Sequence, residues 1–188
     1  GTIIDDFESG VAPGTACPAG GLPLGFCTFN GAGSSVTISN PATPPAPVLP
    51  AVGTPNNVLQ MDVDVTSFAG FIHGFTNTAM DTWVPQDWST SEGFSLWLHG
   101  TNSGTQLFID ILDNRNPGST TDDAERWTVS FFDDFVGWEQ LEFPFASFTR
   151  KEIGNGAPND GFSFFEVLSW ALGALDTGGP RTYYVHEV

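Results

Sequence analysis

The chain has few of the positive charges that nucleic-acid and membrane binding require. Its 188 residues include only 5 Lys and Arg, with Lys151 as the single lysine, against 22 Asp and Glu, so the formal net charge at pH 7 is −17. Phosphate backbones and anionic membrane surfaces would be repelled by this charge, which argues against both as partners. A neutral ligand such as a glucan would not feel the repulsion.

Long hydrophobic runs and abundant cysteines are also missing. No run of 18 apolar residues occurs, so no segment is expected to span a membrane. The only cysteines, Cys17 and Cys27, flank the aperiodic stretch PAGGLPLGF, and no nearby His or Cys completes a zinc site. We expect a disulfide that clips this loop, and therefore an oxidising compartment; two unpaired thiols are the alternative.

The ends of the sequence carry a further expectation. The sequence opens at Gly1 without a signal-peptide pattern and stops inside the strand-like TYYVHEV. We therefore expect a module cut from a longer secreted polypeptide.

Residues typical of strands and turns are abundant. The sequence has 17 Phe, 6 Trp, 22 Gly and 14 Pro, a composition typical of all-β proteins. The length fits one domain with a substantial core, which we place at residues 1–188. Two irregular stretches interrupt it: the Cys-clipped loop at about 10–27, and a surface insertion at about 40–57, where repeated prolines fix φ and remove hydrogen-bond donors.

Alternating apolar and polar residues predict the strands. In VLQMDVDV, Leu59, Met61 and Val63 share one face, while polar residues occupy the other. Similar segments follow at spacings of about ten to twenty residues: GFIHGFT, GFSLWLHG, TQLFIDILD, ERWTVSFF, WEQLEFPF, EVLSWALGAL and TYYVHEV. Eight or more antiparallel strands in one chain predict a two-sheet antiparallel β-sandwich of the jelly-roll type.

Four segments occur in an order that matches a known family. These are IDDFE near the N-terminus, DWS before a strand, ERWTVSF, and then WEQLEFPFASFTR. In these the chain resembles the family 11 carbohydrate-binding modules of the galactose-binding-like jelly-roll superfamily, from Ile3 to Val188 apart from the two irregular stretches. The W-x-x-L-x-F-P-F-x-x-F pattern also occurs in intracellular assembly factors of that superfamily, so it supports the fold more than the ligand.

The resemblance implies a function. Family 11 modules are non-catalytic parts of secreted glycan hydrolases, bind β-glucan chains in a groove on a concave sheet and carry structural calcium. The strands of GFIHGFT, TQLFIDILD, ERWTVSF and VLSWALGA would form that sheet here. The departure from the family is Ser169, Ala171 and Gly173, where the family has larger side chains, which implies a wider groove, a different ligand or a lost site.

Alternation also indicates which side chains face the groove. Leu107, Ile109 and Ile111 fit the core, so Asp110 points outward; Trp127 packs inward, so Arg126 points outward. In GFIHGFT the polar His73 favours an outward face that Phe71 shares. Aromatic rings stack on sugars and polar side chains bind hydroxyls, so the candidate ligand contacts on these strands are Phe71, His73, Asp110 and Arg126.

Three loop or strand-end residues complete the candidate binding site. The resemblance places Asp123, in DDAERW, and Arg150, in SFTRK, at positions where family members contact the ligand. Trp88, in PQDWS, is a loop aromatic, a type of residue that commonly contacts ligands.

Acidic residues near both ends of the chain suggest a metal site. Because the first and last strands of this jelly roll lie side by side, Asp6 and Glu8 would approach Glu187. Carboxylates at a strand end suit Ca²⁺, which takes six to eight oxygen ligands. The alternative is a set of solvated acids at a sheet edge, and His186 stands where the family usually has Asp.

Two other functional classes compete with a binding module. A retaining glycosidase needs two carboxylates about 5 Å apart, but Asp110 and Asp113 would lie on opposite faces of one strand. A lyase would need a Tyr or His base beside Arg or Lys, and the only tyrosines, Tyr183 and Tyr184, lie in the last strand, so we expect no enzyme. A structural or adhesive surface module is the stronger alternative, because the small residues at 169, 171 and 173 are compatible with it.

Overall fold

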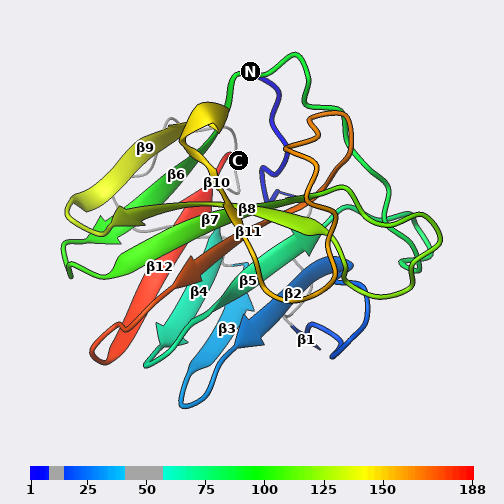
Figure 1. The fold of residues 1–188 in the computed structure, drawn as a ribbon. Helices are drawn as coiled ribbons and strands as arrows, with labels where there is room; N and C mark the ends of the chain where they lie inside the picture. The colour runs from blue at the N-terminus through cyan, green and yellow to red at the C-terminus, as the bar shows by residue number, and fades with distance from the viewer. Residues whose placement is uncertain (9–14, 41–56) are drawn as a thin grey trace.

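The computed structural model describes residues 1–8, 15–40 and 57–188, and in them the strands form two facing sheets (Figure 1). The seven-stranded sheet contains, in order, β1 (Thr15–Ala16), β2 (Gly25–Asn30), β5 (Ala69–Gly74), β11 (Val167–Ala174), β7 (Gln106–Asp113), β8 (Glu125–Phe132) and β10 (Thr149–Lys151). The five-stranded sheet contains β3 (Ser35–Ser39), β4 (Leu59–Asp64), β12 (Pro180–His186), β6 (Gly93–Thr101) and β9 (Val136–Pro144).

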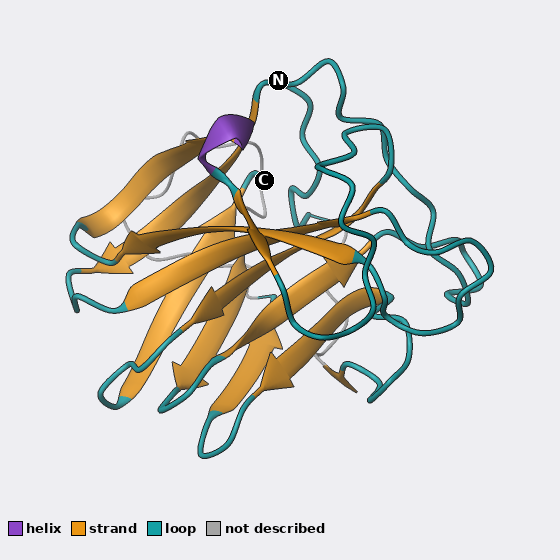
Figure 2. Cartoon of the chain, in the orientation of Figure 1, coloured by secondary structure: helices purple, strands orange, loops and turns teal. Residues whose placement is uncertain are grey.

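The predicted all-β sandwich is confirmed. Every strand pair is antiparallel except β1 with β2. The one helix in the described ranges is the 3-10 turn η1 (Phe145–Ser147), so no helix there is long and apolar enough to cross a membrane (Figure 2). Most of the predicted surface insertion at 40–57 lies outside the described residues.

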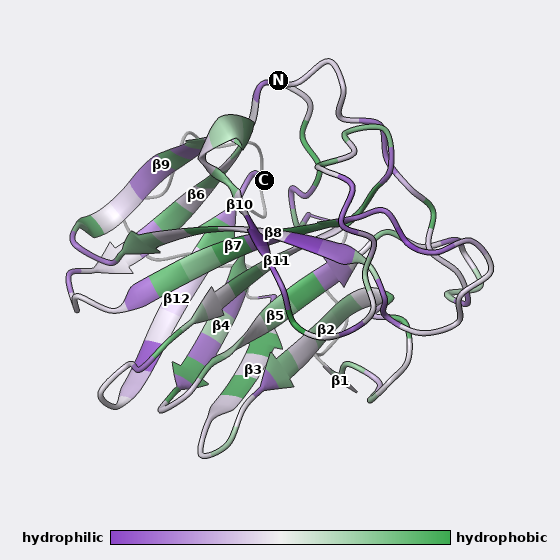
Figure 3. Ribbon diagram, viewed as in Figure 1, coloured by the Kyte–Doolittle hydropathy of each residue, from purple (hydrophilic) through white to green (hydrophobic). Residues whose placement is uncertain are grey.

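The core lies between the sheets, where alternation sends every second side chain. The fully buried side chains include Leu107, Ile109 and Ile111 of β7 and Leu59 and Met61 of β4. The alternating colours along β4 in Figure 3 show the same pattern. Burial of each such side chain contributes about 1.5–3 kcal/mol, so this face of every strand is fixed by its apolar residues.

Asp133, in the connection that crosses from β8 to β9 of the other sheet, is hydrogen-bonded to the β6–β7 connection. Its buried carboxylate accepts hydrogen bonds from the Thr101 backbone N at 2.8 Å, the Ser103 Oγ at 2.6 Å and the Tyr183 hydroxyl at 2.9 Å. Burial acts to raise the pKa of Asp133, but the hydrogen bonds from Ser103, Thr101 and Tyr183 outweigh it and lower the pKa.

The two ends of the chain lie side by side, as predicted. The Ile4 backbone N donates to the Val188 carbonyl at 2.7 Å, and the Val188 N donates to the Asp5 carbonyl at 2.9 Å. The segment IDDFE is nevertheless not a regular strand, because Phe7 has a left-handed φ of 61° that interrupts an extended ladder.

The expected disulfide is present. Cys17 and Cys27 are bonded, and the loop between them begins next to the short parallel pair of β1 and β2. This bond ties the irregular segment to the edge of the seven-stranded sheet.

Candidate ligand groove

A groove of about 660 Å³ lies on the outer face of the seven-stranded sheet. Side chains of β2, β5, β11, β7, β8 and β10 line it, so it runs across the strands. Neighbouring strands are about 4.8 Å apart, and six of them span about 24 Å, enough for an extended ligand.

The strand register arranges this face in three rows that cross the sheet. The first row is Phe29, Gly70, Gly173, Phe108 and Ser130. The second row is Cys27, Ile72, Ala171, Asp110, Thr128 and Thr149. The third row is Gly25, Gly74, Ser169, Leu112, Arg126 and Lys151. The members of these rows that line the groove form its floor.

Phenylalanines form an aromatic border along the first row. The Phe29 ring centroid is 6.3 Å from that of Phe68 and 6.4 Å from that of Phe108. A Cβ atom at Gly173 would stand 2.2 Å from the Phe108 ring, so the glycine allows this ring to lie across β11. Phe68 is 44% exposed and supplies an open apolar surface at the rim.

Asp110 and Lys151 form an ion pair beside this border. The Lys151 Nζ lies 3.1 Å from Asp110 Oδ2 and 4.5 Å from the Phe108 ring centroid. Asp110 Oδ1 is buried and has no hydrogen-bond partner within the described segments. An unpaired buried acceptor is costly, so a ligand donor that reaches it would gain a hydrogen bond the protein itself does not supply.

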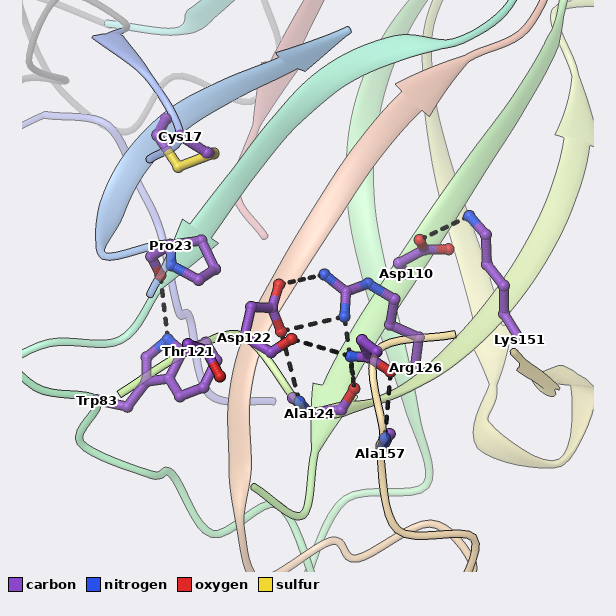
Figure 4. Close-up of polar contacts among 12 residues, drawn as sticks. Cys17, Pro23, Trp83, Asp110, Thr121, Asp122, Ala124, Arg126, Lys151 and Ala157 are labelled. Atoms are coloured by element: carbon purple, nitrogen blue, oxygen red, sulfur yellow. Dashed lines mark hydrogen bonds and ion pairs between the residues drawn. A yellow bond between two sulfur atoms is a disulfide. The ribbon is translucent and has the colours of Figure 1, made fainter. Parts of the chain in front are cut away.

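Arg126 and Asp122 form a second pair in the groove, drawn in Figure 4. The two guanidinium NH groups of Arg126 contact the two carboxylate oxygens of Asp122, at 2.5 and 3.2 Å. Asn155 holds the surrounding backbone by donating to the carbonyls of Asp122 and Ala124. The pair is therefore a rigid polar surface, with forked donors and acceptors of the kind that bind neighbouring hydroxyl groups.

Two predicted contacts lie in the groove. Asp110 and Arg126 both line it, together with Phe108, Thr128 and Ser130, as the alternation along β7 and β8 predicts. Their position is confirmed, and their contact with a ligand stays a prediction.

The prediction for β5 is wrong. Phe71 is fully buried in the core, and His73, two residues along, shares its face. The Nδ1 atom of His73 is 2.8 Å from the Asp5 carboxylate, and its ring stacks on Phe26 at 4.1 Å. Polarity was misleading, because the N-terminal segment supplies an inner partner for the histidine, and Ile72 lines the groove instead.

Trp88 is not a groove residue either. It is 8% exposed and packs in the core against Phe75, Phe94 and Phe145, with its indole N donating to Gln86 Oε1 at 3.0 Å. The tryptophan anchors its loop to the core, so the inference from loop position to ligand contact fails here.

Asp123 and Arg150 each lie one residue away from a groove residue. Asp123 is buried and accepts a hydrogen bond from Asn116 at 2.8 Å, whereas Asp122 lines the groove. Arg150 pairs with Glu152 at 2.7 Å and lies 3.4 Å from the buried Glu125, whereas Lys151 lines the groove. Successive strand residues point to opposite faces, so a shift of one residue in β10 moves the side chain away from the groove.

Sequence reasoning missed Phe29, Phe68, Asp122 and Lys151. The only signal for Lys151 was its place on the strand beside Arg150, and Asp122 was indistinguishable from Asp123 in the pair DD. Phe29 and Phe68 carry no local mark. Phe29 meets Phe68 and Phe108 only because β2 pairs with β5, β5 with β11 and β11 with β7.

The acids proposed for calcium have protein partners. Asp6 Oδ1 accepts from the Glu8 backbone N and Glu8 Oε1 from the Asn57 backbone N, both at 3.0 Å, and Glu187 lies 4.0 Å from His186. Residues 1–8, 15–40 and 57–188 contain no group of three or more His, Cys, Asp or Glu that could hold a metal ion. Calcium binding by Asp6, Glu8 and Glu187 therefore stays a prediction.

A family model and solved structures match the chain. The model of the carbohydrate binding domain (family 11) matches residues 2–162. A family 11 carbohydrate-binding module from Clostridium thermocellum, in complex with a β-1,3-1,4-mixed-linked tetrasaccharide, shares 18% identity at a TM-score of 0.69, covering 98% of this chain and 91% of that one. The chain matches no curated protein.

Two further structures show the same fold. The family 11 module of the cellulosomal cellulase Lic26A-Cel5E of Clostridium thermocellum shares 17% identity at a TM-score of 0.67, with coverage of 99% and 91%. An exo-β-agarase structure shares 11% identity at a TM-score of 0.55, and the match covers 99% of this chain but 24% of the agarase chain. At these identities the likeness concerns the fold.

Proposed function

Because this chain belongs to family 11 of the carbohydrate-binding domains, we propose that it binds a β-glucan-type polysaccharide in the groove on its seven-stranded sheet. The observation that carries this proposal is the pairing of an aromatic border with a row of polar side chains in one groove. The rings of Phe29 and Phe68 suit the apolar faces of pyranose units, and Arg126 and Asp122 suit their hydroxyls. A neutral glucan also fits a chain with a net charge of −17.

A non-catalytic role agrees with this family membership. Asp113, three residues from Asp110, is fully buried on the other side of β7 and accepts hydrogen bonds from Trp127 and the Ser163 backbone. Within the groove, Asp110 and Asp122 are each paired with a cation. The two carboxylates therefore serve as hydrogen-bond acceptors, not as an acid and a base.

The wider setting is also part of the proposal. The family 11 module of a cellulosomal cellulase has the same fold, which supports attachment of this chain to a secreted glycoside hydrolase. The disulfide supports an oxidising, extracellular location. Calcium binding by Asp6, Glu8 and Glu187 is supported by the adjacent chain ends, and a rise in melting temperature with Ca²⁺ over a chelator is the expected sign.

The direct test is affinity electrophoresis and calorimetry against mixed-linkage β-glucan, laminarin, xyloglucan and xylan. We expect binding to a β-glucan, and a loss of about tenfold or more in affinity for Arg126→Ala, because the variant removes the fork of donors. Arg181→Ala is the matched control, since Arg181 lies on β12 of the other sheet.

Two outcomes would contradict the proposal. Equal losses for Arg126→Ala and Arg181→Ala would move the site away from the groove. A folded protein that none of the four polysaccharides retards would favour the structural or adhesive surface module instead.

A further inference from the structure

A loop of the chain itself occupies part of the groove face. On the β2, β5 and β11 side, the third row consists of Gly25, Gly74 and Ser169. A Cβ atom at Gly74 would stand 1.7 Å from the Pro23 carbonyl oxygen, so the loop backbone lies directly on β5. Ser169 beside it is fully buried. The Cys-clipped loop therefore fills the space above this half of the third row.

Three kinds of contact fix the loop in this place. The Cys17–Cys27 disulfide ties both of its ends together. The Trp83 indole N donates to the Pro23 carbonyl at 3.0 Å in a buried position, as Figure 4 shows. Leu22 and Leu24 pack on a hydrophobic cluster outside the main core that contains Trp83. A loop held in this way acts as a fixed surface with a defined position.

The loop narrows the groove that remains. Cys17 and Pro23 line the groove next to Ile72 and Ala171 of the second row. Rows on one face are two residues apart, or about 6.7 Å, and the loop covers this half of the third row, so only the second row lies between the loop and the aromatic border on the first row. Asp122 and Arg126 line the same groove beyond the end of the loop. A single sugar chain running across the strands would have this wall along one side.

We propose that residues 18–24 form a specificity wall, which admits an unsubstituted β-glucan chain and excludes glucans whose backbone carries side-chain sugars. The proposal rests on the function proposed above, because it takes the groove as the glucan site. Substituents that project toward the third row meet the Pro23 backbone, and steric exclusion of this kind gives selectivity without adding affinity for the chosen ligand.

The first test needs only the native protein. Calorimetry against mixed-linkage β-glucan, which is unbranched, and against xyloglucan, which is xylose-substituted, should give a Kd ratio of about tenfold or more in favour of the unbranched polymer. Equal affinity for the two would overturn the wall.

The second test uses variants that weaken the contacts holding residues 18–24 in place. In Trp83→Phe, and separately in Leu22→Ala, the Kd ratio should fall toward one because xyloglucan binding improves while β-glucan binding is kept; both residues hold the loop from outside the groove lining. Trp97→Phe, the same change on β6 of the other sheet, is the matched control and should keep the native ratio. If Trp83→Phe, which removes the hydrogen bond to Pro23 and shortens a buried ring, does not fold, Leu22→Ala, which removes packing of the loop on the cluster around Trp83, decides the outcome.

The outcomes separate the two proposals. No binding of any glucan by the native protein would reject the proposed function, and the wall with it. Binding of β-glucan with a Kd ratio that every folded variant keeps would reject the wall alone. Parallel loss of both ligands in the variants would also reject it, since the loop would then only support the fold.

Discussion

Asp113 is a carboxyl group at the inner side of β7 with no exposure to solvent. It accepts hydrogen bonds from the Trp127 indole N at 3.2 Å and from the Ser163 backbone N. Burial raises the pKa of Asp113 to about 7, and the nearby Glu125 adds to the increase while the hydrogen bonds oppose it. The carboxyl therefore loses its proton within the neutral range in the folded protein.

This pKa predicts a pH dependence of stability. The folded-state value lies above the ordinary value of 3.8, so the stabilisation from the bound proton is fully present below pH 3.8 and is lost as the pH rises toward about 7. In Asp113→Asn that loss should disappear. Urea unfolding between pH 4.5 and 8 measures it: the free energy of unfolding should fall more steeply in the native protein than in the variant. If the free energy of unfolding fell with pH equally in the native protein and in the variant, the raised pKa of Asp113 would be contradicted.

At the residue scale, the sequence predicted correctly which face of the sheet some side chains point to, but not others. On β7 and β8 the apolar residues of one face are unbroken, so Asp110 and Arg126 were correctly placed outward. On β5 both faces carry apolar residues, and only the distant Asp5 decides that His73 points inward. Alternation along a strand shows which residues share a face. Which of the two faces points into the core depends on partners far away in the sequence.

At the scale of elements, Asp133 fixes the break between β8 and β9. The sequence shows this break as Asp133-Asp134 between two apolar strands, and both strands form as predicted. It does not show that Asp133 is fully buried and that its donors come from Thr101, Ser103 and Tyr183. This hydrogen-bonded cluster, called the Asp133 hub below, joins three segments, at residues 101–103, 133 and 183, which are separated by up to 82 residues.

Removing this hub should destabilise the sandwich. Asp133→Ala leaves several buried donors without an acceptor, at about 1–3 kcal/mol each, so we expect the free energy of unfolding to fall by at least about 3 kcal/mol. Asp134→Ala is the control: Asp134 is exposed, and we expect a change of no more than about 0.5 kcal/mol. Chemical denaturation of both variants measures this difference, and equal losses would show that Asp133 is not the hub.

At the scale of the whole molecule, the groove depends on the order of the strands. Its three rows combine residues from Gly25 to Gly173, and strands β2, β5, β11 and β7 become neighbours only in the folded sheet. The jelly-roll class could be predicted, because alternation and turn residues determine it locally. The aromatic border and the loop on Gly74 could not, because they follow from the register between strands distant in sequence.

The measurement that tests the central claim most directly is backbone NMR of the native protein during titration with a mixed-linkage β-glucan oligosaccharide. We predict chemical-shift changes concentrated in the amides of β5, β11, β7, β8 and β10, strongest around Phe108, Asp110 and Arg126, with β4, β6, β9 and β12 nearly unchanged. Changes confined to the five-stranded sheet, or no changes at saturating oligosaccharide, would contradict the assignment of the groove as the glucan site.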